Sequence, residues 1–91
     1  MKAYHLLIKG HVQGVGYRNA MEWTAHRLGV KGWVRNRKEG TVEAVVEGND
    51  ASVARLLKWC WQGPPNAYVT AIEETEQAPE GLQGFVRKPT V

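Results

Sequence analysis

Two segments with helical spacing, each lying between segments of strand character, most limit the folds that this chain can adopt. The first apolar stripe follows the spacing i, i+4, i+7, i+11 and consists of Tyr17, Met21, Thr24 and Leu28. Gly29 follows where a glycine commonly ends a helix. We therefore expect a helix over about 19–28.

The second stripe follows the spacing i, i+3, i+4, i+7 and consists of Val53, Leu56, Leu57 and Cys60. Asn49 or Asp50 can cap this helix, and Gly63-Pro64-Pro65 ends it. A thiol on such a stripe is most simply a buried core residue.

Strand patterns surround both helices. Residues 3–9 alternate imperfectly, which suits a central strand covered at least partly on both faces. Residues 32–48 indicate a hairpin with a turn around Lys38-Glu39-Gly40, and its second strand has one apolar side and one solvent-facing side. Residues 67–76 indicate a further strand, whose broken alternation predicts a bulge near Thr70-Ala71. Residues 81–87 indicate a short last strand.

The element order is thus β-α-β-β-α-β with a short strand added at the end. Two helices that each connect strands of one sheet, around a central antiparallel hairpin, predict an α+β ferredoxin-like sandwich. Its sheet is mainly antiparallel, and both helices cover one face. With 91 residues, the chain is expected to form a single domain over 1–91.

The charge is uneven along the chain. Residues 1–45 hold eight Lys and Arg against three Asp and Glu, a net charge of +5, whereas residues 46–91 hold four against six, a net charge of −2. This favours an anionic ligand for the first half, although a merely soluble basic surface explains the charge alone equally well. No apolar run suits a signal peptide or membrane span, and the lone Cys60 fits a reducing compartment, so we expect a cytoplasmic protein.

The stretch "HVQGVGYRNA" (11–20) joins the first strand to the first helix. Gly14 and Gly16 let the backbone curl so that free N–H groups at the helix start converge on an anion, and Arg18 adds a planar charge that matches phosphate oxygens. A Walker-type loop and a dinucleotide fingerprint fail on spacing. A structural turn with an incidental exposed arginine remains the alternative.

The histidines and tryptophans suggest no further chemistry. His5, His11 and His26 lack the spacing of metal ligands, so we expect surface histidines and no metal site. The tryptophans could stack on nucleic-acid bases, but filling the core or an interface is the more common role of Trp23, Trp33, Trp59 and Trp61. Arg35, Arg37 and Lys38 could steer anions or simply be solvated.

Two blocks of the sequence together resemble the acylphosphatase family. "GHVQGVGYR" (10–18) is similar to its first signature, and "GWVRNRKEGTVEAVVEG" (32–48) is similar to its second. "LGV" (28–30) and "GPPNAYV" (63–69) extend the likeness over nearly the whole chain. Four residues depart from the family pattern: His11, the neighbours Asn19 and Ala20, and Arg87, which stands where an apolar residue is usual.

This resemblance implies hydrolysis of acyl phosphates to a carboxylate and inorganic phosphate, without metal or cofactor. Arg18 would bind the phosphoryl group, and Asn36 would position the attacking water. The phosphate cradle would be the backbone of Gln13, Gly14, Val15, Gly16, Tyr17 and Arg18. None of the departures touches Arg18 or Asn36 in this interpretation, and the enzyme is expected to be monomeric.

Two other functions fit the same fold. An RNA-recognition domain would need a basic, aromatic octapeptide on a central strand, but residues 41–48 read "TVEAVVEG", with two glutamates and no aromatic residue. We therefore expect no nucleic-acid partner. A catalytically silent module of a larger assembly is the second alternative, to which we prefer a free-standing enzyme.

Overall fold

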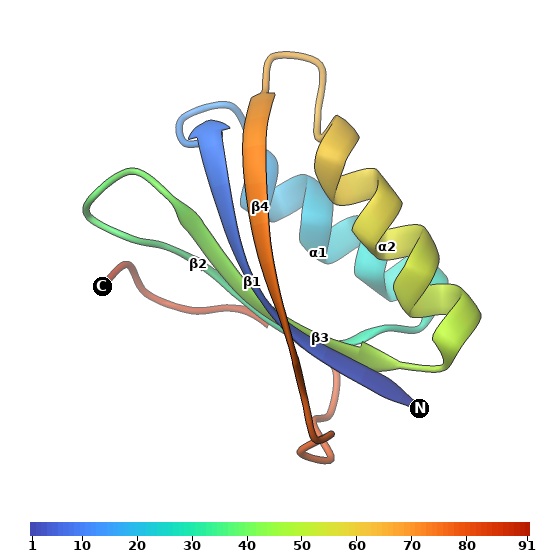
Figure 1. The fold of residues 1–91 in the computed structure, drawn as a ribbon. Coiled ribbons are helices and arrows are strands. Elements are labelled where there is room, and N and C mark those ends of the chain that lie inside the picture. The colour runs from blue at the N-terminus through green and yellow to red at the C-terminus, as the bar shows by residue number, and fades with distance from the viewer.

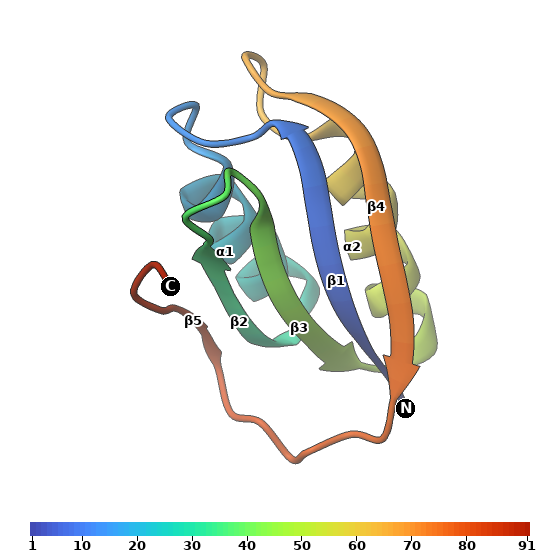
Figure 2. The ribbon, with the colours of Figure 1, turned by 60° about the vertical axis from the view of Figure 1, so that its left-hand side comes forward.

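The computed structural model describes residues 1–91 and contains one five-stranded sheet covered by two helices on one face (Figures 1 and 2). The elements follow in the order β1 (Lys2–His11), α1 (Tyr17–Leu28), β2 (Lys31–Asn36), β3 (Val42–Gly48), α2 (Asp50–Gln62), β4 (Tyr68–Gln77) and β5 (Phe85–Arg87). The strand order is β4-β1-β3-β2-β5, antiparallel except for the parallel pair β2 and β5. This confirms the predicted ferredoxin-like sandwich. Neither helix is long and apolar enough to cross a membrane.

The core lies between the sheet and the helices and contains a cluster of 15 buried residues. Both predicted helical stripes face it, since Tyr17, Met21 and Thr24 are buried on α1 and Val53, Leu56 and Cys60 on α2. Asn49 caps α2 as expected, because its side chain accepts a hydrogen bond from Ser52 N at 2.8 Å.

The prediction that tryptophans fill the core holds only for Trp59, which packs against the core, because none of the four tryptophans is fully buried. Trp23 and Trp61 are 63% and 49% exposed, and Trp33 and Trp59 are half-buried. Trp59 covers the edge of the core, with its ring centroid 5.3 Å from that of Tyr17. Aliphatic side chains, together with Tyr17, Met21 and Phe85, fill the centre instead.

The prediction that one side of residues 41–48 faces solvent is also wrong, because every residue of β3 is buried. β3 is the middle strand, so its outer face is covered by neighbours on both sides. Glu47 is only 2% exposed and accepts hydrogen bonds from the backbone N–H groups of Glu80 and Leu82, both at 2.8 Å. The segment after β4 therefore folds back over this strand.

Two predictions concerned the last two strands, β4 and β5. The predicted bulge is confirmed, since Lys9 and Gly10 of β1 pair with Ala71 and Val69, which leaves Thr70 of β4 as the extra residue. The last strand is shorter than the expected 81–87, because Gly81 and Gly84 have φ of 75° and 68° and residues 80–82 bind Glu47. The three residues of β5 then run beside β2.

Candidate active site

The glycine loop follows β1 and leads directly into α1. Gly14 and Gly16 have φ of 74° and 81°, values that only glycine adopts without strain. A Cβ added at either position would meet no atom within 4 Å, so backbone conformation and not crowding requires glycine here. The space beside this loop is open.

No side chain compensates the positive electrostatic potential at the start of α1. Gly16 is its N-cap and offers no capping side chain, and the first turn holds no acidic residue. The first backbone N–H groups of a helix have no partner in the helix, and the helix dipole adds about half a positive charge there. The loop and helix start together therefore suit a bound anion.

One cavity of about 140 Å³ lies at this helix start, lined by Val12, Gln13, Gly14, Gly16, Tyr17, Arg18, Asn19, Asn36 and Arg87. It brings together both residues expected to be catalytic, Arg18 and Asn36. Four of the other predicted cradle residues line it as well. The exception is Val15, whose side chain packs against the hydrophobic core.

Arg18 projects from the first turn of α1 and has no carboxylate partner. The ion pairs of this end of the molecule use Arg37 and Arg87 instead. Since a half-buried guanidinium is costly to leave without a counter-charge, an anion in the cavity is the partner that the geometry allows.

Asn36 is the last residue of β2 and lines the cavity across from the helix. Its side-chain Oδ1 is buried and has no hydrogen-bond partner. Its backbone is held, because the Asn36 carbonyl accepts a hydrogen bond from Val91 N at 3.2 Å. A buried acceptor without a partner is rare. Because Asn36 itself lines the cavity, a turn of its amide would bring Oδ1 to a water or ligand there.

Gln13 ties the glycine loop to the β2–β3 turn. Its Nε2 donates hydrogen bonds to the carbonyls of Arg37 at 2.8 Å and Thr41 at 2.9 Å. The side-chain donor Nε2 is thus occupied, which leaves the Gln13 backbone N–H as the donor that could contribute to a cradle. This contact sets the loop against the residue that follows Asn36.

Comparison with known proteins assigns the chain to a family. The family model for acylphosphatase matches residues 4–87. The chain belongs to the acylphosphatase family. An acylphosphatase of Synechococcus sp. is 52% identical over 87 residues, which cover 96% of this chain and 93% of that protein. An acylphosphatase of Thermococcus kodakarensis is 56% identical, with 89% of each chain covered.

The solved structures show the same likeness. The crystal structure of acylphosphatase from Bacillus subtilis superposes on this acylphosphatase with a TM-score of 0.93 at 34% identity, covering 97% of this chain and 99% of the other. The fold and the family that the sequence resemblance implied are therefore confirmed.

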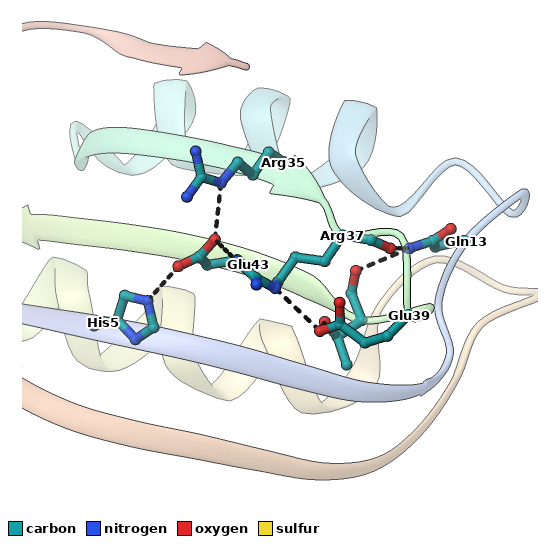
Figure 3. A network of polar contacts seen from close by, with 7 residues as sticks. His5, Gln13, Arg35, Arg37, Glu39 and Glu43 are labelled. Carbon is teal, nitrogen blue, oxygen red and sulfur yellow. Dashed lines mark hydrogen bonds and ion pairs between the residues drawn. The ribbon is translucent and has the colours of Figure 1, made fainter. Parts of the chain in front are cut away.

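A network on the face of the sheet away from the helices supports the β2–β3 turn (Figure 3). Glu43 accepts from Arg35 Nε at 2.8 Å and Arg37 Nη1 at 3.0 Å, and it lies 2.7 Å from His5 Nε2. Burial raises the pKa of Glu43, but these hydrogen bonds outweigh burial and lower it to about 2. Arg37 also bonds Glu39 at 3.0 Å. Two arginines that could have steered anions are thus engaged in holding the turn.

The structure revises the expectations for the histidines. His5 is not a free surface residue, because it binds Glu43 across the strand pair. His26 is exposed on α1 and lies 3.0 Å from the Phe85 carbonyl. His11 is exposed and does not line the cavity. No group of three His, Cys, Asp or Glu side chains gathers into a possible metal site.

Asn19 and Arg87 line the cavity with Arg18 and Asn36, although both are among the departures that were expected to touch neither of those two residues. Arg87 in particular was given no place in the site. The only signal in the sequence was its departure from the apolar residue usual in the family. A charged side chain on a short edge strand looks like ordinary surface until the strand is placed beside β2.

Proposed function

We propose that this acylphosphatase hydrolyses its acyl phosphate substrate in the cavity at the start of α1, with Arg18 and Asn36 as its catalytic residues. The phosphoryl group would lie against the backbone N–H groups of residues 13–18, with the Arg18 guanidinium holding two of its oxygens. Asn36 would accept a hydrogen bond from the attacking water through Oδ1 and so align it with the phosphorus.

The reaction needs few groups beyond the backbone N–H groups, Arg18 and Asn36. The water oxygen forms a bond to phosphorus as the bond from phosphorus to the acyl oxygen breaks, and the electron pair of that bond leaves with the carboxylate. A carboxylate is a weak base and departs without protonation, so no general acid is needed. A loose phosphoryl-transfer transition state asks mainly for charge stabilisation and alignment. The proton of the water ends on the phosphate product.

One observation carries this assignment. Asn36, whose buried Oδ1 has no partner, and Arg18, which forms no ion pair, line the same cavity at the start of a helix. One group lacks a donor and the other lacks an anion. A phosphorylated substrate would pair with Arg18, and its attacking water would pair with Asn36 once the amide turns Oδ1 into the cavity.

The direct test is turnover of benzoyl phosphate or acetyl phosphate by the purified protein. We expect turnover without added metal, undiminished by EDTA. Activity lost on chelation and restored by a divalent ion would contradict the metal-free mechanism.

Two variants separate the roles of the residues. Arg18→Ala should abolish both turnover and phosphate binding, with losses of about 2–5 kcal/mol for an unpaired charge partner. Asn36→Ala should keep phosphate affinity, measured by calorimetry, while kcat falls steeply, because the cradle stays and only the water is misaligned. Wild-type kcat in Asn36→Ala, or phosphate binding lost as fully as in Arg18→Ala, would overturn these roles.

The wider organisation is also part of the proposal. Residues 1–91 would form a single acylphosphatase-like domain, which the one sheet and one core cluster support. A monomeric state rests on the sequence alone. Light scattering on the purified protein tests this state. A cytoplasmic location rests on the sequence alone and is tested by cell fractionation.

A further inference from the structure

We propose that Arg87 is a further catalytic residue of this acylphosphatase, whose guanidinium pairs with the carboxylate as it leaves the phosphorus. This inference rests on the proposed function above. Arg18 and Arg87 are the two charged side chains of the cavity lining, and no carboxylate lies among the lining residues.

The position of Arg87 follows from the register of β5. Arg87 pairs with Val34 of the parallel strand β2, and Val34 is fully buried beneath the helices. Partners in a parallel pair share a face of the sheet, so Arg87 points toward α1. Lys88 points to the other face, where its Nζ lies 4.4 Å from the centroid of the Trp33 ring.

Glu22 holds Arg87 at the mouth of the cavity. Its Oε1 lies 3.1 Å from Arg87 Nε, and it stands four residues after Arg18, on the same side of α1. This pair uses the Nε edge of the guanidinium, which leaves both terminal nitrogens without a protein partner. The Arg87 side chain is 48% exposed.

This placement suits the leaving group better than the phosphoryl group. Arg18 is half-buried and grows from the helix start beside the cradle, whereas Arg87 is exposed and reaches the cavity from an edge strand. A phosphoryl group in the cradle leaves the acyl part at the mouth. There the bridging oxygen becomes anionic only as its bond to phosphorus breaks.

The partial compensation by Glu22 fits the same role. A cation that is already paired attracts the resting substrate weakly, yet it can share its free terminal nitrogens with a charge that appears during the reaction. Interactions that strengthen toward the transition state raise kcat, whereas uniform binding does not. Glu22 is then a positioning residue for Arg87.

The test compares Arg87→Gln with the matched control Lys88→Gln, which removes the same charge one residue away but outside the cavity. Substrates are benzoyl phosphates with 4-nitro, unsubstituted and 4-methoxy rings, whose leaving carboxylates increase in basicity in that order. Inhibition by inorganic phosphate is measured in parallel. Circular dichroism confirms folding, which the loss of an exposed ion pair should not disturb.

We expect Arg87→Gln to lower kcat/KM about tenfold for the 4-methoxy substrate, below the loss for a fully buried donor because the residue is half-exposed. The loss should be smaller for the 4-nitro substrate, whose departing carboxylate needs less stabilisation. The inhibition constant of phosphate should stay within about twofold of wild type. Lys88→Gln should behave like wild type, and Arg87→Lys should recover part of the rate.

Other results overturn the inference. If phosphate inhibition weakens as much as kcat/KM falls, Arg87 binds the phosphoryl group instead. A loss equal for all three substrates, or no loss, removes any role at the leaving group. These outcomes require an active wild-type enzyme, so they are distinct from failure of the proposed function, in which wild type itself does not turn over.

Discussion

Replacement of Asn36 by alanine should make the protein more stable while it destroys activity. The Asn36 Oδ1 is buried and has no hydrogen-bond partner. A buried polar group left unpaired costs about 1–3 kcal/mol of folding free energy. Alanine removes this acceptor and makes only a small space beside an existing cavity, so a net gain of about 1 kcal/mol is expected.

Urea unfolding and thermal melting in phosphate-free buffer measure this gain. In a domain of this size, 1 kcal/mol corresponds to a rise in Tm of about 4–8 °C. Phosphate must be absent, because a ligand that binds only the folded state adds its own stabilisation.

Asn49→Ala is the matched control. Asn49 also carries a side-chain acceptor, but that acceptor binds Ser52 N at the start of α2. The same substitution there should lower the free energy of unfolding by about 1 kcal/mol. Activity should be unchanged, because β3 runs antiparallel to β1 and so places Asn49 at the end of the sheet opposite the glycine loop (Figure 1).

The two asparagines should therefore shift stability in opposite directions. If Asn36→Ala is destabilised as much as Asn49→Ala, the Asn36 amide makes a stabilising hydrogen bond to another group of the protein. It would then not be free to align a water, and the reasoning behind its role would be refuted.

Three further predictions concern other parts of the site. Arg18→Lys keeps the charge but cannot hold two oxygens in fixed geometry, so kcat/KM should fall about a hundredfold or more. A value within about threefold of wild type would show that charge alone suffices. Gly16→Ala and Gly81→Ala, at φ of 81° and 75°, should each lose about 1–2 kcal/mol in urea unfolding, but only Gly16→Ala should weaken phosphate binding in calorimetry; equal phosphate affinities would argue against the cradle. Because the pKa of Glu43 is lowered in the folded state, the stabilisation from its carboxylate is fully present above pH 4.5 and is lost as pH falls toward 2. Urea unfolding between pH 2 and 6 should therefore show a steeper loss of stability in acid for wild type than for Glu43→Gln. Parallel curves would contradict the network.

The sequence predicted those features of the fold that depend on neighbours along the chain. The stripes of α1 and α2, the Asn49 cap and the left-handed glycines of the loop follow from spacing and from the backbone freedom of single residues. The order of these elements then left the ferredoxin-like sandwich as the expected fold. Family resemblance added Arg18 and Asn36, and the structure places both in one cavity.

The tertiary structure alone decided which polar groups are buried and what they bind. Glu43 and Glu47 alternate along β3 as solvent-facing residues would, yet arginines with His5 cover one and a distant loop covers the other. The Gln13 side chain likewise binds the β2–β3 turn, a partner far away in the sequence. Arg87 reaches the cavity only because β5 pairs with β2. Alternation along a strand fixes which side a residue faces, but what covers that side depends on segments far away in the chain.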